Sequence, residues 1–106
     1  MIIQVERTGG FAGLSMHAVI DTERLDAEER EELEDLVEKS EFFRLPSRLT
    51  ANTLAVNQFE YIITIEDEVQ RHTLEAHEEA LDPRLLELVR RVLRLARRQQ
   101  REKKDD

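Results

Sequence analysis

The sequence predicts an α+β fold, in which a four-stranded, largely antiparallel sheet carries two packed helices in the order ββαββα. Four short segments alternate apolar and polar residues, which is typical of half-buried strands, and two longer segments repeat apolar residues at helical spacing. With 106 residues, of which 40% are hydrophobic, the chain is long enough for one compact core. We therefore predict a single domain over residues 1–98 and a charged tail over residues 99–106 that frays.

The first two strands are predicted at residues 2–7 and 14–20, joined as a hairpin. The tip, residues 8–14, contains all three glycines of the chain and reads Thr-Gly-Gly-Phe-Ala-Gly-Leu. Glycine reaches positive φ without a steric penalty, so this tip can make a tight turn and let another backbone approach closely. Phe11 is then either an apolar anchor displayed on a loop or an aromatic side chain that folds back onto the sheet.

The first helix is predicted to begin after Asp26, whose side chain can cap it. Glu29 follows three residues later and can reach back to the cap, as in a capping box. Leu33, Leu36 and Val37 give this helix an apolar stripe, which predicts the face that packs on the sheet.

Two unusual segments follow the first helix. Residues 42–46 contain two of the four phenylalanines and are predicted to plug the core under the sheet, and Pro46 ends regular structure there. Residues 47–57 form a predicted loop without any Asp or Glu, of a length at which loops in compact domains are often functional. Its larger apolar side chains are either anchors for a partner or a satellite cluster under the loop, and they are Leu49, Leu54 and Val56.

The second half of the chain repeats the strand, strand, helix order. Residues 59–65 are the strongest predicted strand, and residues 66–68 turn into a partner strand at residues 69–76. Asp82 is a helix-capping residue and Pro83 suits the first helical position, so the second helix is predicted to start here.

The net charge of −8 is unevenly distributed. Residues 1–83 carry 20 acidic and 7 basic side chains, whereas residues 84–106 carry 9 basic and 4 acidic ones. The main interpretation is that the basic helix docks on an acidic part of the same domain. The alternative is a nucleic-acid or ribosome-associated module that uses this helix, but the segment lacks aromatic residues for base stacking, so a nucleic-acid partner is not expected. A third hypothesis is an interaction subunit that offers this helix to a partner helix.

The residue types argue against an enzyme. The chain has no cysteine, which excludes a disulfide framework, a thiolate nucleophile and a cysteine-based zinc site. The segment His77-Glu78-Glu79-Ala80-Leu81 begins like the HExxH zinc-peptidase motif, but Leu81 stands where the second histidine must be. His17 and His72 add no recognisable metal spacing, and the glycine cluster lacks the Lys-Ser/Thr ending of a phosphate-binding loop. We therefore predict neither a metal site nor a cofactor.

The location of the protein follows from what its sequence lacks. Its N-terminus does not resemble a signal peptide, and no apolar run approaches the length of a membrane span. We therefore expect a cytoplasmic protein without membrane contact.

Several segments in this order resemble the emfourin family of bacterial protein inhibitors. The resemblance spans residues 3 to about 95 and depends on the glycine-rich hairpin tip, the acidic helix ending in Leu-Val, and four further segments. These segments are Phe42-Phe43-Arg44-Leu45-Pro46, Phe59-Glu60-Tyr61-Ile62-Ile63-Thr64-Ile65-Glu66-Asp67, Arg71-His72-Thr73-Leu74 and Pro83-Arg84-Leu85. The resemblance implies a non-enzymatic, cytoplasmic inhibitor of thermolysin-like, protealysin-type zinc metallopeptidases, and we expect it to be a monomer. In this family two neighbouring loops bind the peptidase, one offering an acidic zinc ligand and the other placing apolar side chains in substrate pockets.

The two loops found from the residues alone, 8–14 and 47–57, match this expectation. The predicted protease-binding residues are Gly9, Gly10, Phe11, Ala12, Gly13, Leu14, Leu49, Asn52, Leu54, Val56 and Asn57. Neither loop contains a carboxylate, and Asn57 stands where the family tends toward an acidic residue. Three modes remain open: a water-mediated zinc contact through Asn52 or Asn57, a carboxylate such as that of Glu60, or steric plugging alone.

Overall fold

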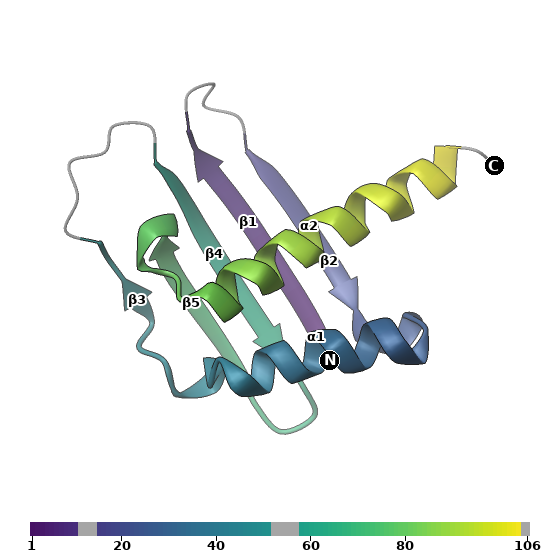
Figure 1. Cartoon of the computed structure of the whole chain (residues 1–106), viewed down its shortest axis with the longest axis horizontal. Coiled ribbons are helices and arrows are strands. Elements are labelled where there is room, and N and C mark those ends of the chain that lie inside the picture. Colours follow the sequence, from purple (N-terminus) through teal and green to yellow (C-terminus); the bar gives the residue numbers. More distant parts are fainter. Residues whose placement is uncertain (11–14, 52–57, 105–106) are drawn as a thin grey trace.

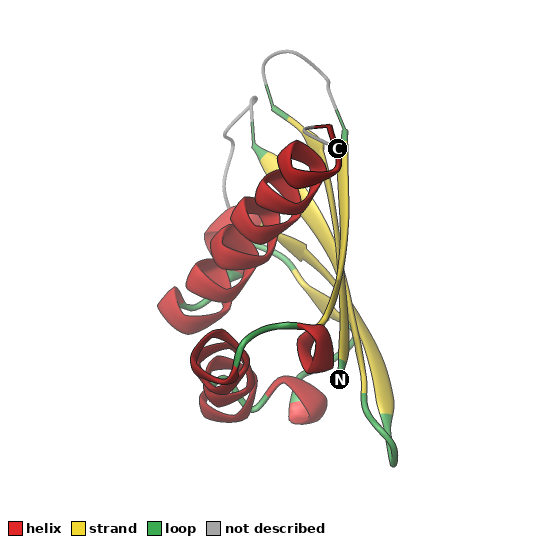
Figure 2. Cartoon of the chain, turned by 90° about the vertical axis from the view of Figure 1, so that its right-hand side faces the viewer, coloured by secondary structure: helices red, strands yellow, loops and turns green. Residues whose placement is uncertain are grey.

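The computed structural model describes residues 1–10, 15–51 and 58–104, and it places two helices on one face of a five-stranded sheet (Figures 1 and 2). The helices are α1 (Ala27–Lys39) and α2 (Pro83–Lys104). The strands are β1 (Ile2–Gly9), β2 (Met16–Asp21), β3 (Arg48–Leu49), β4 (Phe59–Glu66) and β5 (Arg71–His77). The predicted α+β class is confirmed.

The sheet differs from the prediction in strand number and direction. Its order is β2-β1-β4-β5-β3, and β3 runs parallel to β5 while the other pairs are antiparallel. The prediction of four largely antiparallel strands was therefore wrong, because the segment predicted as loop 47–57 begins with a strand. Two residues are too few to show an alternating pattern. This edge position is held by backbone pairing, including a 2.9 Å hydrogen bond from the Glu75 N–H to the Ser47 carbonyl.

The core lies between the sheet and the two helices. Side chains alternate on the central strands, so that Ile63 and Ile65 are fully buried while Ile62 is exposed on the helix-free face. The predicted plug is also present, because Phe42 is fully buried in the short 3-10 helix Phe42–Arg44. The other fully buried large side chains are Ile3, Val5, Ile20, Leu33, Leu74, Leu85, Leu88, Val89 and Val92.

The predicted capping box of α1 is half formed. Oδ1 of Asp26 accepts a 2.9 Å hydrogen bond from the Glu29 N–H, as expected for a cap. The Glu29 carboxylate does not return to the cap, because it binds both terminal nitrogens of Arg98 at 2.8 and 2.9 Å. The bidentate, charge-assisted pair with Arg98 is stronger than a single hydrogen bond from a backbone N–H to the same carboxylate.

Helix α2 starts as predicted and extends into the charged tail. Oδ1 of Asp82 accepts hydrogen bonds from the backbone N–H groups of Arg84 and Leu85, at 2.8 and 3.0 Å. The helix continues to Lys104, and the fraying expected from residue 99 stays a prediction. Arg98 contributes to this extension because it links α2 to Glu29 of α1 and also lies 3.9 Å from Glu102, one turn later. The domain boundary at residue 98 stays a prediction.

The turn between β4 and β5 is organised by one carboxylate. Oδ1 of Asp67 accepts hydrogen bonds from the Val69 and Gln70 N–H groups at 2.9 and 3.0 Å. These bonds favour the ionised form, so the Val69 amide and then the Gln70 amide lower the pKa of Asp67.

The lowered pKa makes the contribution of this turn depend on pH. A carboxylate whose folded pKa is lowered stabilises the protein above its unfolded pKa, and the effect is lost as pH falls through the folded pKa. We expect Asp67→Ala to lower the free energy of unfolding near neutral pH, and the difference from wild type to shrink toward about pH 2. Urea unfolding of both proteins across this range measures the effect. A difference that stays constant down to the lowest pH would contradict it.

Candidate functional site

The two predicted loops arise from neighbouring strands at one end of the sheet (Figure 1). In the antiparallel register of β1 and β4, Gly9 lies opposite Phe59 and Thr8 opposite Glu60. The Gly10 N–H then donates a 3.3 Å hydrogen bond to the Gln58 carbonyl. The end of one loop is therefore bonded directly to the beginning of the other.

Both glycines at the start of the hairpin tip have backbone conformations that disfavour other residues. Their φ angles are +88° for Gly9 and +78° for Gly10, as expected for a tight glycine turn. A Cβ atom on Gly9 would lie 2.7 Å from the Gln58 carbonyl oxygen, and one on Gly10 would overlap the ring of Phe59. Glycine is required here both for the φ angle and for the close approach of β4.

Phe59 supports the turn at Gly9 and Gly10, although the sequence predicted it only as part of a strand. Its ring packs against Gly10, and the Arg7 guanidinium carbon lies 4.5 Å from the ring centroid. This arrangement combines a cation–π contact with aromatic cover over a glycine. The role of Phe59 could be recognised only from its position opposite the glycine pair. That position depends on the register of β1 and β4, which the sequence alone does not give.

The second loop is held at its start by His77. Nδ1 of His77 accepts a 3.3 Å hydrogen bond from the Ala51 N–H. Nε2 of the same ring lies 3.5 Å from Oε1 of Glu60. From the sequence, His77 was a candidate only for metal ligation, whereas its neighbours in the structure are a loop amide and a carboxylate.

A small cavity of about 150 Å³ lies beside these groups on the helix-free face of the sheet. Its lining includes Thr8, Leu49, Thr50, Glu60 and His77, and so joins the ends of both loops. The Glu60 side chain is 63% exposed, which leaves a solvent-accessible carboxylate at the base of the loops. Glu60 is therefore a carboxylate close to two loops that contain no Asp or Glu.

On the opposite face of the sheet, Tyr61 is buried near the same end of β4. Its hydroxyl donates a 3.0 Å hydrogen bond to Oε1 of Glu78, and burial together with this carboxylate raises the pKa of Tyr61. The bond ties the 3-10 helix Glu78–Ala80 to β4 directly below the loops. The loop bases are therefore braced from both sides of the sheet.

The structure describes three of the predicted site residues. Gly9 and Gly10 lie in the turn, and Leu49 lies in β3, where it is partly buried and packs against the core. The remaining predicted site residues lie outside the described residues, and these are Phe11, Ala12, Gly13, Leu14, Asn52, Leu54, Val56 and Asn57.

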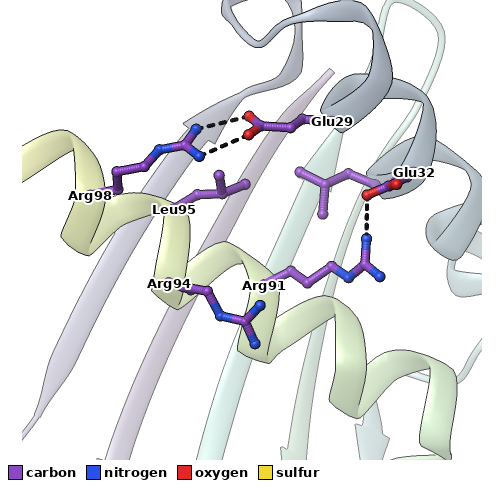
Figure 3. A pocket seen from close by; sticks show the side chains of 7 residues that line it. Glu29, Glu32, Arg91, Arg94, Leu95 and Arg98 are labelled. Atoms are coloured by element: carbon purple, nitrogen blue, oxygen red, sulfur yellow. Dashed lines mark hydrogen bonds and ion pairs between the residues drawn. The ribbon is translucent and has the colours of Figure 1, made fainter.

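The basic helix docks on the acidic helix, as the charge distribution predicts (Figure 3). Arg98 binds Glu29 through both terminal nitrogens, and Nη1 of Arg91 lies 2.6 Å from Oε2 of Glu32. Arg94, between them, points away from both carboxylates (Figure 3). The pairing with Glu29 raises the pKa of Arg98. These internal ion pairs line a hollow of about 280 Å³ between the helices, and they reduce the charge available for a phosphate backbone.

The described part of the chain contains neither a cluster of metal-ligating side chains nor a membrane-spanning helix. Within residues 1–10, 15–51 and 58–104, no three His, Asp or Glu side chains form a group that could hold a metal ion. No helix in the same ranges combines the length and the apolar character needed to cross a bilayer.

Comparison with known proteins identifies the family. The family model named Emfourin matches residues 5–93, which include both loops, the β4–β5 hairpin, most of the β1–β2 hairpin and the first half of α2. Neither a curated protein nor a solved structure matches this chain. Since the family model covers well over half of the sequence, the resemblance seen in the sequence is confirmed. The chain belongs to the Emfourin family, a family of protease inhibitors.

Proposed function

We propose that this protein inhibits a thermolysin-like zinc metallopeptidase by inserting residues 8–14 and 47–57 together into the active-site cleft. Family membership supports an inhibitor, and the pairing of Gly9 with Phe59 supports joint action of the two loops. The observation that carries the proposal is the hydrogen bond from Gly10 to Gln58, which joins the loops at their bases.

Fixing the ends of the two loops in the free protein favours tight binding. A loop that must be ordered on association loses conformational entropy, which weakens the complex. Here Phe59, His77 and Tyr61 fix the chain on either side of the loops before any partner arrives. More of the interaction energy of the loop side chains is then available for binding.

The apolar anchors are assigned to Phe11, Leu54 and Val56. Leu49 packs against the protein's own core, so it supports the second loop and does not enter the cleft. A large apolar side chain that fills a preformed pocket contributes about 1.5 to 3 kcal/mol. Two such anchors are enough to account for a tight complex.

The positions of the carboxylates bear on whether the protein blocks the peptidase cleft sterically or by ligating its zinc. Neither loop contains Asp or Glu, and Glu60 lies on β4 beside His77. An amide oxygen from Asn52 or Asn57 is a weaker zinc ligand than a carboxylate. We therefore favour steric plugging over direct zinc ligation. Glu60→Gln separates the two modes, because plugging predicts unchanged inhibition and ligation by Glu60 predicts a large loss.

We expect near-stoichiometric loss of activity when thermolysin is titrated with this protein and cleavage of a small peptide substrate is followed. Phe11→Ala and Leu54→Ala should each weaken inhibition by about tenfold or more, because each removes an apolar anchor. Val69→Ala is the matched control, since Val69 is 86% exposed in the turn at the opposite end of the sheet. Full activity of the peptidase at high excess of the wild-type protein would reject the proposal for this enzyme.

A further inference from the structure

One edge of the sheet is open beside the second helix. Strand β2 is the terminal strand in the order β2-β1-β4-β5-β3, and in the described part of the chain it pairs only with β1. Its outer backbone N–H and C=O groups therefore have no strand partner there. Open edges of this kind accept an additional strand through main-chain hydrogen bonds.

Helix α2 extends past this edge. It crosses the helix-covered face of the sheet and projects beyond β2 toward Lys104 (Figure 1). A strand added next to β2 would therefore lie under the projecting turns of the helix. A groove of about 260 Å³ lies between the helix and β2. Met16, Leu93 and Ala96 contribute apolar atoms to its lining, and Ser15, His17 and Arg97 contribute polar ones.

The projecting part of α2 is positively charged. Arg97 and Arg101 are exposed, and Nη2 of Arg97 lies 3.9 Å from Sδ of Met16 on β2. Arg91 and Arg98, by contrast, are already bound to carboxylates of α1. Neither Arg97 nor Arg101 has an ion pair with any carboxylate that the structure describes. The open edge is therefore accompanied by two cations with no internal counter-charge among these residues.

We propose that β2 and the projecting part of α2 bind an extended, acidic segment of a partner protein, which joins the sheet as a sixth strand. Its backbone pairs with the outer edge of β2, and its acidic side chains face Arg97 and Arg101. Side chains at the alternate positions point to the helix-free face of the sheet, beside the exposed Val19 of β2.

An acidic peptide segment fits this edge better than a second copy of the chain or a nucleic acid. A second copy paired edge to edge through β2 would bring two sets of these arginines together, which is unfavourable. A nucleic acid lacks the alternating backbone donors and acceptors that an edge strand pairs with, and the protein as a whole carries a charge of −8. None of the residues that line this groove belongs to the loops that act in the proposed inhibition.

The test is an NMR titration of the ¹⁵N-labelled full chain with a capped peptide of about seven residues that alternates glutamate and valine. We expect amide shifts along Met16–Asp21 and at Arg97. Methylation of alternate peptide nitrogens should abolish binding, because it removes the donors and keeps the charge. Replacing glutamate with lysine in the peptide should also abolish it.

Matched variants test the charge contribution. Arg97→Glu is expected to weaken peptide binding by about tenfold or more, while Arg90→Glu, the same change farther from the edge on the same helix, leaves it unchanged. Equal binding of the N-methylated peptide, or equal effects of the two variants, would overturn the proposal in favour of unspecific charge attraction. Shifts along β2 caused by self-association without peptide, or by an oligothymidine at the same affinity, would overturn it as well.

Discussion

Replacing Phe42 with alanine is expected to lower the free energy of unfolding by about 3 to 5 kcal/mol. The side chain is fully buried in the 3-10 helix between α1 and β3. Its ring meets those of Phe43 and His72 edge to face, with centroids 5.7 and 5.4 Å apart. Truncation removes these contacts and leaves a cavity at the junction of α1, β5 and the start of the second loop.

Urea unfolding of the wild type and the variant measures this loss directly. Phe43→Ala is the matched control, because the neighbouring phenylalanine is only partly buried and should lose distinctly less stability. Domains of this size are stable by about 5 to 15 kcal/mol, so Phe42→Ala removes a substantial share of the total stability. Equal losses for the two variants would show that Phe42 does not act as the core plug.

The predictable part of the fold is the part encoded by local patterns. Alternation identified the four longer strands, and Asp26 and Asp82 identified the helix starts, because both signals depend only on neighbouring residues. Strand β3 was missed because its two residues carry no pattern of their own. The Glu29 carboxylate was misassigned because its partner, Arg98, is distant in sequence and more favourable than the nearby cap.

In the candidate site, too, local features could be predicted from the sequence, whereas contacts between distant segments could not. The requirement for glycine at positions 9 and 10 was visible in the sequence, because positive φ is a local property. The contacts that support the site were not visible. Phe59 meets Gly10, and His77 meets Ala51, only because the sheet places β1 beside β4 and β5 beside β3. Such partners are determined by strand order and register, which no single segment contains.

The glycine pair gives the second prediction with a large expected effect. Gly9→Ala and Gly10→Ala are each expected to lower the free energy of unfolding by about 1 to 3 kcal/mol, because alanine is strained at positive φ and its Cβ meets β4. Each should also weaken inhibition of thermolysin, since the hairpin tip must shift relative to the second loop. Urea unfolding and the inhibition titration, run on the same samples, measure both effects.

A second substitution at Phe59 distinguishes the two positions. The Cβ at position 10 meets the Phe59 ring, so Phe59→Ala should make the additional Gly10→Ala change less harmful than it is in the wild type. The Cβ at position 9 instead meets the carbonyl oxygen of Gln58, which no side-chain change removes, so Gly9→Ala should be equally harmful in both backgrounds. If Phe59→Ala eased neither or both, the close packing of the two loop bases would not be the reason that glycine is needed. A result specific to position 10 would link the loop geometry to one identified ring, and the inhibition titration would show whether peptidase binding depends on it.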